Sequence, residues 1–272
     1  MKLHPADKDF TLSSIDPHDN GGFDDREKAE EEAKRDLEKL YDLHYRMFAE
    51  NKRSLLIILQ SMDAGGKDGT IRHLAAGLNP QGLHVTSFKV PSGEELEHDY
   101  LWRCHKAAPR RGEAAIFNRS QYEEVLIVRV HPEIVEQRNF PPGTATGDDL
   151  FKERYRQIND FERMLAENGT VILKFMLHIS PEEQLERIEK RRSDSERQWK
   201  YAESDMKERE HWDEYMTAYQ KMIRHTSTSH APWYVIPADR KWYRNYLIGR
   251  IIVERLKELE MKFPKLGERV GD

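Results

Sequence analysis

Residues 54–70 read SLLIILQSMDAGGKDGT, and this stretch determines how the rest of the chain is interpreted. Residues 54–60 are almost continuously aliphatic, which is typical of a strand buried on both faces of a parallel sheet. A glycine-rich turn follows and opens a helix. Backbone N–H groups at such a helix N-terminus converge on one point, where a phosphate can bind. The predicted phosphate contacts are Gly65, Gly66, Lys67, Asp68, Gly69 and Thr70.

The loop departs from the P-loop (Walker A) pattern G-x-x-x-x-G-K-[ST] at two positions. Gly66 and Lys67 are present, but Ser61 takes the place of the first glycine. Asp68 replaces the hydroxyl residue that helps to hold Mg²⁺, so another oxygen ligand is needed. Asp63 is the candidate, because Mg²⁺ near phosphates takes hard carboxylate oxygens. For this motif alone, a strand that turns into a helix through glycines and binds nothing remains the alternative.

The 272 residues are enough for one large α/β domain with insertions. A net charge of −5 argues against a general nucleic-acid or membrane-surface binder. The single cysteine, Cys104, excludes an internal disulfide and fits a reducing compartment. The first ten residues contain no apolar signal region, and no stretch approaches the ~20 apolar residues of a membrane span. We therefore expect a cytoplasmic protein with no nucleic-acid or membrane partner.

Hydrophobic periodicity divides the chain into an extended arm, residues 1–23, and a single domain, residues 24–272. Strands are predicted at 54–60, 83–89, 113–117, 170–179 and 233–237. Helices are predicted at about 24–50, 92–107, 149–168 and 205–225, after the capping box at 180–183, and from the last strand to about 261, with a loop at 131–148. Five strands alternating with helices predict an α/β fold with a doubly wound parallel sheet and helices on both faces.

In such a sheet the ligand lies beyond the C-terminal ends of the strands. Lys89 closes the second predicted strand, while Asn118 and Arg119 follow the third. The basic run 187–192 lies farther from its strand and suggests a mobile helical lid over about 183–212, although a solvated helix face is the alternative. A kinase needs a phosphate cradle, a carboxylate for the metal and cations that neutralise the transferred group. These segments together predict a phosphotransferase.

Five blocks of the chain resemble the polyphosphate kinase 2 family. They are SMDAGGKDGT, SFKVPSGEELEHDYLWR, FNRSQYEEVLIVRV, HISPEEQLERI and APWYVIPADRKWYRN, in the family's order. The resemblance runs from about Leu55 to the C-terminal helix. It implies a P-loop kinase-like fold with a helical lid, and a cytoplasmic, Mg²⁺-dependent homo-oligomer that moves phosphoryl groups between inorganic polyphosphate and nucleotides. We expect a dimer or tetramer, and the helix at 24–50 is a candidate contact.

The resemblance also assigns roles to individual residues. Asp63 matches the family's loop metal or catalytic carboxylate, and Lys67 matches its phosphate-binding lysine. The predicted catalytic residues are Asp63, Lys67, Arg119 and Glu123. The predicted metal ligands are Asp63, Asn118 and Glu123. The predicted phosphate and polyphosphate contacts outside the loop are Lys89, Arg187, Arg191 and Lys200.

One departure bears on the nucleotides accepted. Many members carry a motif resembling D-R-S-x-Y-N, whereas residues 118–123 here read NRSQYE, so that the carboxylate and the amide have exchanged places. This variant resembles the class III members, which phosphorylate nucleoside mono- and diphosphates. We therefore expect AMP to be converted through ADP to ATP, with Glu123 more important than Asn118. An ordinary ATP-dependent nucleotide kinase and a nucleotide-sensing module without turnover are the alternatives.

Overall fold

Five parallel strands form one sheet in the order β2-β3-β1-β4-β5. The computed structural model describes residues 5–23 and 25–267. The strands are β1 (Ser54–Gln60), β2 (Leu83–Ser87), β3 (Ala114–Asn118), β4 (Thr170–His178) and β5 (Trp233–Pro237). Every residue of β1 is buried between β3 and β4, which explains its continuous aliphatic sequence. The loop after β1 leaves the sheet where the strand order reverses, the usual ligand position in this architecture.

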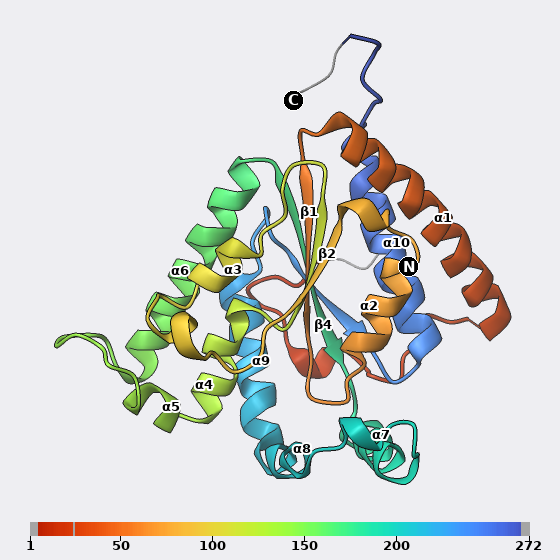
Figure 1. Ribbon diagram of the computed structural model, residues 1–272. Helices are drawn as coiled ribbons and strands as arrows, with labels where there is room; N and C mark the ends of the chain where they lie inside the picture. The colour runs from red at the N-terminus through yellow and green to blue at the C-terminus, as the bar shows by residue number, and fades with distance from the viewer. Residues whose placement is uncertain (1–4, 24, 268–272) are drawn as a thin grey trace.

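Helices cover both faces of the sheet, as expected for a doubly wound fold (Figure 1). One face carries α1 (Arg26–Glu50), α2 (Lys67–Ala75) and α10 (Lys241–Lys257), and the other carries α3 (Trp102–Lys106), α4 (Ile127–Val130), α6 (Gly147–Glu167) and α9 (Trp212–Thr226). The remaining α-helices are α5 (Glu133–Glu136), α7 (Pro181–Ser193) and α8 (Glu203–Glu208), and 3₁₀ helices span Leu12–Ser14, Pro80–Gly82, Gly93–Leu96, Gln121–Val125, Gln198–Lys200 and Arg209–His211. The α/β prediction is confirmed.

The capping box before α7 forms in part. The Ser180 hydroxyl accepts a hydrogen bond from the Glu183 N–H group (3.2 Å), and Pro181 occupies the first turn. This end of the helix is also fixed from outside, because the Ser180 N–H group donates to Asp239 Oδ1 (2.9 Å). The base of α7 is thereby tied to the turn that follows β5.

The prediction of one helix over residues 92–107 is wrong. The Ser92 side chain makes no capping bond, and Gly93 has a φ of +48°, which a continuous helix does not accommodate. The segment forms the 3₁₀ helix Gly93–Leu96, which buries no residue, and then the short α3. Without an apolar face to bury, the capping pattern is not enough to propagate a helix.

The helix predicted at 205–225 is interrupted. It forms α8, a 3₁₀ turn and α9, because Arg209 is held by Pro181 O (2.9 Å) and by Gln184 Oε1. Other boundaries differ by less: β2 ends at Ser87 and β4 at His178, α10 ends at Lys257, and α5 forms within the predicted loop at 131–148. Asp24, where the first helix was predicted to begin, lies outside the described residues.

The described part of the N-terminal arm runs beside β5. The Ala6 N–H group donates to Trp233 O (2.8 Å), Arg224 Nε donates to Phe10 O (2.6 Å), and Leu12 is buried. A 3₁₀ turn lies within this otherwise extended segment, and residues 1–4 lie outside the described part. No helix in the described ranges is both long and apolar enough to cross a membrane.

Candidate active site

The loop between β1 and α2 encloses the Lys67 amine. Lys67 Nζ donates to Ser61 O (2.9 Å), Ser61 Oγ (3.0 Å) and Met62 O (3.4 Å). Ser61, at the position of the missing glycine, is therefore a partner of the lysine. Burial, with the neighbouring Arg119 charge, lowers the pKa of Lys67 to about 8. An anion bound beside the amine will raise that pKa, because it favours the charged form.

Two glycines make the loop possible. A Cβ on Gly65 would lie 2.5 Å from Ser61 Oγ and 2.9 Å from Met62 O. Gly66 has a φ of +106°, and a Cβ there would lie 2.0 Å from Arg244 Nη1. Neither position has room for a side chain, so the loop at the start of α2 can pack closely against Ser61 and Arg244.

Arg119 links two carboxylates across the site. Its Nη2 atom donates to Asp63 Oδ1 (2.5 Å) and its Nη1 atom to Glu123 Oε2 (3.0 Å). The residue has a φ of +62°, which directs its side chain from the end of β3 towards the phosphate loop. Glu123 is the main cause that raises the pKa of Arg119. The guanidinium thus stays charged between the two acids.

Asp63 is ionised in this arrangement. Burial acts to raise its pKa, but the charges of Arg119 and Lys67 and the Arg119 hydrogen bond outweigh burial, so the pKa lies below the ordinary aspartate value. The Asp63 carbonyl oxygen also accepts from Gln184 Nε2 (2.9 Å), which connects the loop to α7. The site therefore presents a fixed anionic oxygen next to two cations.

A buried polar cluster supports the Gln121–Val125 turn that carries Glu123. Lys174 Nζ, fully buried on β4, donates to Glu162 Oε2 (2.6 Å) and Tyr122 Oη (2.6 Å). The Tyr122 hydroxyl donates to Glu162 Oε1 (2.7 Å), and Gln121 Nε2 donates to the same oxygen (3.1 Å). These contacts anchor Gln121 and Tyr122, and so fix the turn between Arg119 and Glu123.

Asn118 faces a different neighbour from Glu123. Its Nδ2 atom donates to Asp68 Oδ1 (3.3 Å) and Ser87 Oγ (3.4 Å), and its buried Oδ1 atom has no hydrogen-bond partner among the described residues. Asp68 is paired in turn with Lys200. Burial acts to raise the pKa of Asp68, but the Lys200 hydrogen bond and charge outweigh it and lower the pKa. Asn118, Asp68 and Lys200 form a second polar group beside the loop.

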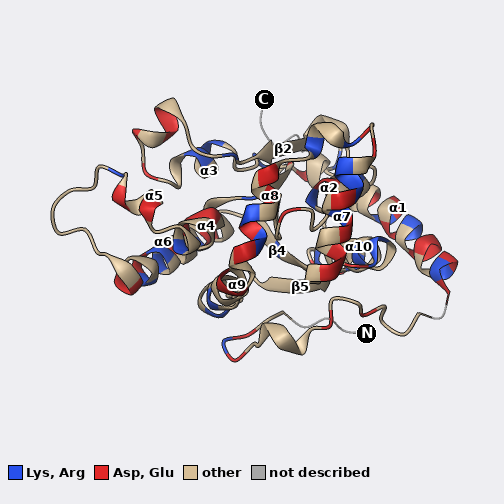
Figure 2. Ribbon diagram, turned by 90° about the horizontal axis from the view of Figure 1, so that it is seen from below, with Lys and Arg blue, Asp and Glu red and all other residues tan. Residues whose placement is uncertain are grey.

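The segment 183–212 crosses the end of the sheet where the phosphate loop lies. Figure 2 looks onto this end and shows α7 and α8 in front of the strands, with acidic and basic residues mixed on both. Arg191 Nη1 pairs with Asp205 Oδ2 (3.1 Å), which joins α7 to α8. Lys89 lies apart from these contacts, exposed after β2.

Arg187 braces the site. Its guanidinium donates to Glu183 Oε1 (2.7 Å) and to the carbonyl oxygens of Ala64 (3.2 Å), Ala238 (2.8 Å) and Asp239 (2.9 Å). It therefore connects α7, the phosphate loop and the turn after β5. Thr70 is similarly engaged, because its hydroxyl donates to Gly66 O (3.3 Å).

Comparison with known proteins decides the family. The model of the family "Polyphosphate kinase 2 (PPK2)" matches residues 23–264. The chain belongs to the polyphosphate kinase 2 family. It is 48% identical to an AMP/ADP-polyphosphate phosphotransferase of Meiothermus ruber, over 97% of this chain and 96% of that protein. It is 43% identical to an ADP-polyphosphate phosphotransferase of Rhodopseudomonas palustris, over 93% and 86% of the two chains.

Solved structures agree with this assignment. The crystal structure of polyphosphate kinase 2 from Arthrobacter aurescens superposes with a TM-score of 0.88 at 38% identity, covering 96% of this chain and 90% of that one. The likeness covers nearly the whole length of both chains. The P-loop kinase-like fold expected for a polyphosphate kinase 2 is therefore shown for this chain.

Several residues of this polyphosphate kinase 2 site were not predicted from the sequence. A small pocket beside Asp63 and Arg119 is also lined by Gln184, Glu208, Tyr215 and Tyr219. The Tyr215 hydroxyl donates to Glu208 Oε2 (2.6 Å). Gln184 could have been identified from the sequence, because it directly follows the capping box at the start of α7. The sequence did not identify the two tyrosines, because at helical spacing on α9 their pattern is that of core residues.

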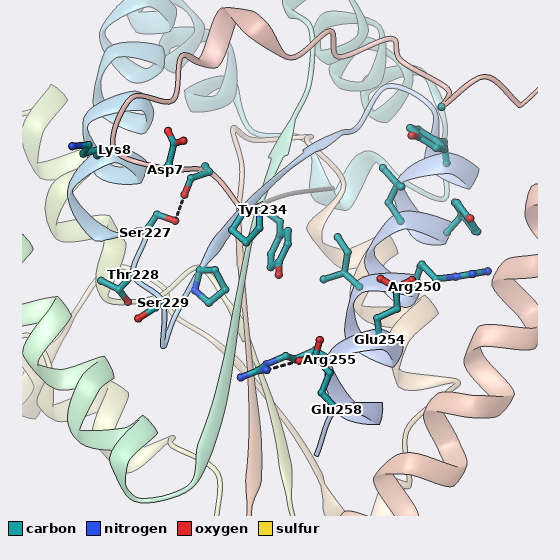
Figure 3. A pocket seen from close by; sticks show the side chains of 18 of the residues that line it. Asp7, Lys8, Ser227, Thr228, Ser229, Tyr234, Arg250, Glu254, Arg255 and Glu258 are labelled. Carbon is teal, nitrogen blue, oxygen red and sulfur yellow. Dashed lines mark hydrogen bonds and ion pairs between the residues drawn. The ribbon is translucent and has the colours of Figure 1, made fainter. Parts of the chain in front are cut away.

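A larger cavity lies away from this chemistry. It has a volume of about 980 Å³ and lies between the N-terminal arm, β5 and α10 (Figure 3). Both signs of charge line it, including Asp7, Lys8, Arg250 and Glu254, and no phosphate-loop residue does. Its size therefore does not make it the active site of the polyphosphate kinase 2.

Proposed function

We propose that the protein moves phosphoryl groups between inorganic polyphosphate and nucleotides, phosphorylating AMP to ADP and ADP to ATP. The observation that carries this proposal is the Arg119 guanidinium, held between Asp63 and Glu123 beside the Lys67 loop. The relatives named as AMP/ADP- and ADP-polyphosphate phosphotransferases support the substrate class.

In the proposed mechanism the chain supplies position and charge. Lys67 and the N–H groups at the start of α2 bind the transferring phosphoryl group, and Arg119 stabilises its equatorial oxygens. The acceptor is a nucleotide phosphate, which is already ionised and needs no strong base. Asp63 orients the acceptor end. The mobile lid brings Arg191 and Lys200 to the polyphosphate, with Lys89 at the outer edge.

The residues present fit Mg²⁺. Asn118 Oδ1, a buried oxygen with no partner among the described residues, lies in the group with Asp68, and the carboxylates of Asp63 and Glu123 are further hard oxygens that bind Arg119 in the neighbouring pocket. Mg²⁺ near phosphates takes one or two such ligands and completes its shell with water and phosphate oxygens. When bound, the ion neutralises charge on the phosphate oxygens. Asp68, next to Asn118, adds a carboxylate that was expected only to bind phosphate.

We place this enzyme in the cytoplasm as a homo-oligomer. Polyphosphate and nucleoside mono-, di- and triphosphates are its proposed partners. The alternative of an ordinary ATP-dependent nucleotide kinase does not explain why the segment 183–212 brings further cations, such as Lys200 and Arg191, to the phosphate loop. A sensor without turnover does not explain why Arg119 is fixed between two acids.

The proposal is tested by incubating protein freed of adenylate kinase with polyphosphate, Mg²⁺ and AMP, and following ADP and ATP over time. We expect ADP to rise first and ATP to follow, and excess EDTA to stop both steps. In a parallel reaction with ADP in place of AMP, polyphosphate and Mg²⁺ should yield ATP. Accumulation of ADP without ATP, or turnover of ADP only, contradicts dual specificity, and binding without transfer favours the sensor.

We also expect Glu123→Ala to reduce transfer more than Asn118→Ala. Glu123 contacts Arg119 in the pocket that contains Asp63, whereas Asn118 contacts Asp68 at the side of the loop. Removing Glu123 frees one end of the guanidinium, so kcat should fall at least tenfold, about 1.4 kcal/mol. Steady-state rates with AMP and with ADP measure both variants. Exposed Glu136→Ala in α5 is the matched control. A nearly silent Glu123→Ala rules out the proposed role.

A further inference from the structure

Arg244 is a buried cation with no counter-ion among the residues that the structure describes. It lies near the start of α10 and is 2% exposed. Its Nε and Nη2 atoms donate to one neutral oxygen, Asn245 Oδ1 (3.2 and 2.9 Å). Its buried Nη1 atom has no hydrogen-bond partner in residues 5–23 and 25–267. A buried guanidinium that lacks a carboxylate is costly, because desolvation is not offset by an opposite charge.

The unpartnered end of Arg244 is aimed at the phosphate loop. A Cβ on Gly66 would lie 2.0 Å from Nη1, and one on Gly69 would lie 3.3 Å from Nη2. The same Gly66 position lies 3.4 Å from Arg187 Nη1. Two guanidinium groups therefore converge on the N-terminus of α2, which itself carries partial positive charge. Positive potential accumulates on one side of Gly66.

The two arginines differ in their partners. Arg187 is bonded to Glu183 and to three backbone carbonyl oxygens, so its donors are used by the fold. Within the described ranges the Arg244 guanidinium bonds only to the neutral Asn245 amide, and burial together with the Arg187 charge lowers the pKa of Arg244 to about 9. The fold thus holds Arg244 at a position where a bound anion would offset the cost of its buried charge. That group cannot be Glu183, which is engaged by Arg187.

Further cations continue away from the loop on this side. Lys241, exposed at the first position of α10, is within electrostatic reach of Arg187, Lys190 and Arg244, with Glu183 as the acidic neighbour. The adjacent aromatic ring, Trp242, packs edge-on against Phe23 and Tyr243 and is not presented to a base. A series of cations without a stacking surface suits repeated phosphates better than a nucleoside.

We propose that Arg244 binds a phosphate of the polyphosphate chain on the α10 side of the phosphate loop, and that Lys241 binds the chain farther out. This inference rests on the proposed function for the identity of the ligand. It gives the polyphosphate a direction: from Lys67, across Gly66, towards the start of α10. Arg244 is then a binding residue for the polyanion, and nucleotide binding does not depend on it.

The test compares Arg244→Met with Arg244→Lys and with the control Arg255→Met, a residue of the far end of α10 that pairs with Glu258. Thermal unfolding is measured with and without tripolyphosphate, and KM is measured for long polyphosphate and for ADP. Methionine fills similar space without charge, so the Tm of the unliganded Arg244→Met protein should equal or exceed that of the wild type. Its tripolyphosphate-induced Tm shift should fall by at least half, and its polyphosphate KM should rise at least tenfold.

We expect KM for ADP to change less than twofold in Arg244→Met, and all values to stay at wild-type levels in Arg255→Met. Arg244→Lys should retain part of the tripolyphosphate shift. A folded Arg244→Met protein with an unchanged shift and polyphosphate KM overturns the proposal, and so does a Tm well below the wild type that Arg244→Lys does not restore.

Lys241→Ala, at an exposed position, provides a test that does not depend on folding. Its polyphosphate KM should rise at least threefold, while its KM for tripolyphosphate should change less; an equal change for both, or none, contradicts the proposed direction of the chain. Wild-type protein that binds tripolyphosphate through Arg244 but transfers nothing refutes the proposed function and leaves the anion site intact.

Discussion

Asp63→Asn is expected to lower the rate of phosphoryl transfer at least a hundredfold, about 2.7 kcal/mol. The change keeps the shape of the side chain and removes the charge that the pocket holds ionised beside Arg119 and Lys67. Without that charge the acceptor and any bound metal lose an anionic oxygen, while the fold keeps its core contacts. The loss should therefore appear in kcat and kcat/KM together.

Single-turnover rates with ADP and polyphosphate measure this effect, and circular dichroism checks the fold. Asp42→Asn, an exposed change on α1, is the matched control and should retain the full rate. If Asp63→Asn keeps a tenth or more of the wild-type rate, the carboxylate does not act on the reacting groups.

The second large effect is on stability. Glu162→Gln is expected to lower the free energy of unfolding by about 3–5 kcal/mol, because it leaves the Lys174 ammonium buried without a counter-charge. Urea denaturation monitored by tryptophan fluorescence measures the loss. Glu167→Gln, exposed near the end of the same helix, is the control and should change the free energy by less than about 0.5 kcal/mol.

The double variant Glu162→Gln/Lys174→Met separates the charge from the packing. Removing both charges should recover part of the lost free energy of unfolding, because burying an uncharged pair of similar volume has no charge-desolvation cost. If Glu162→Gln alone lowers the free energy of unfolding by less than about 1 kcal/mol, the buried pair does not stabilise the fold as expected.

The strands were predictable because burial on both faces leaves a continuous aliphatic signal, as in β1. The helix at 92–107 was not, because a capping pattern is local, whereas a helix also needs a face to bury and Gly93–Leu96 buries nothing. The break at Arg209 depends on contacts with Pro181 and Gln184. These residues are distant in sequence, so the hydrophobic periodicity of 205–225 could not predict the contacts.

The site residues also divide into those that a sequence motif identifies and those that only the fold brings together. Asp63 and Lys67 were recognisable within the loop motif, and Arg119 and Glu123 within the resemblance to the family; the structure brings all four together. Arg244 was not recognisable, because an arginine near the start of an amphipathic helix is usually solvated and nothing local indicates 2% exposure. Its partner in space, Gly66, lies far along the chain.

The internal pairing of the cations around the phosphate loop has a consequence for the proposed turnover. Arg119 rests on Asp63 and Glu123, Lys200 on Asp68, and Lys67 on carbonyl oxygens of its own loop. When a phosphate enters, its oxygens replace these acceptors as partners of the cations. The net binding free energy per contact is therefore the difference between two similar interactions. Such a site can recognise a densely charged polymer and still release it, because Arg119, Lys200 and Lys67 each have an internal anion or dipole to return to.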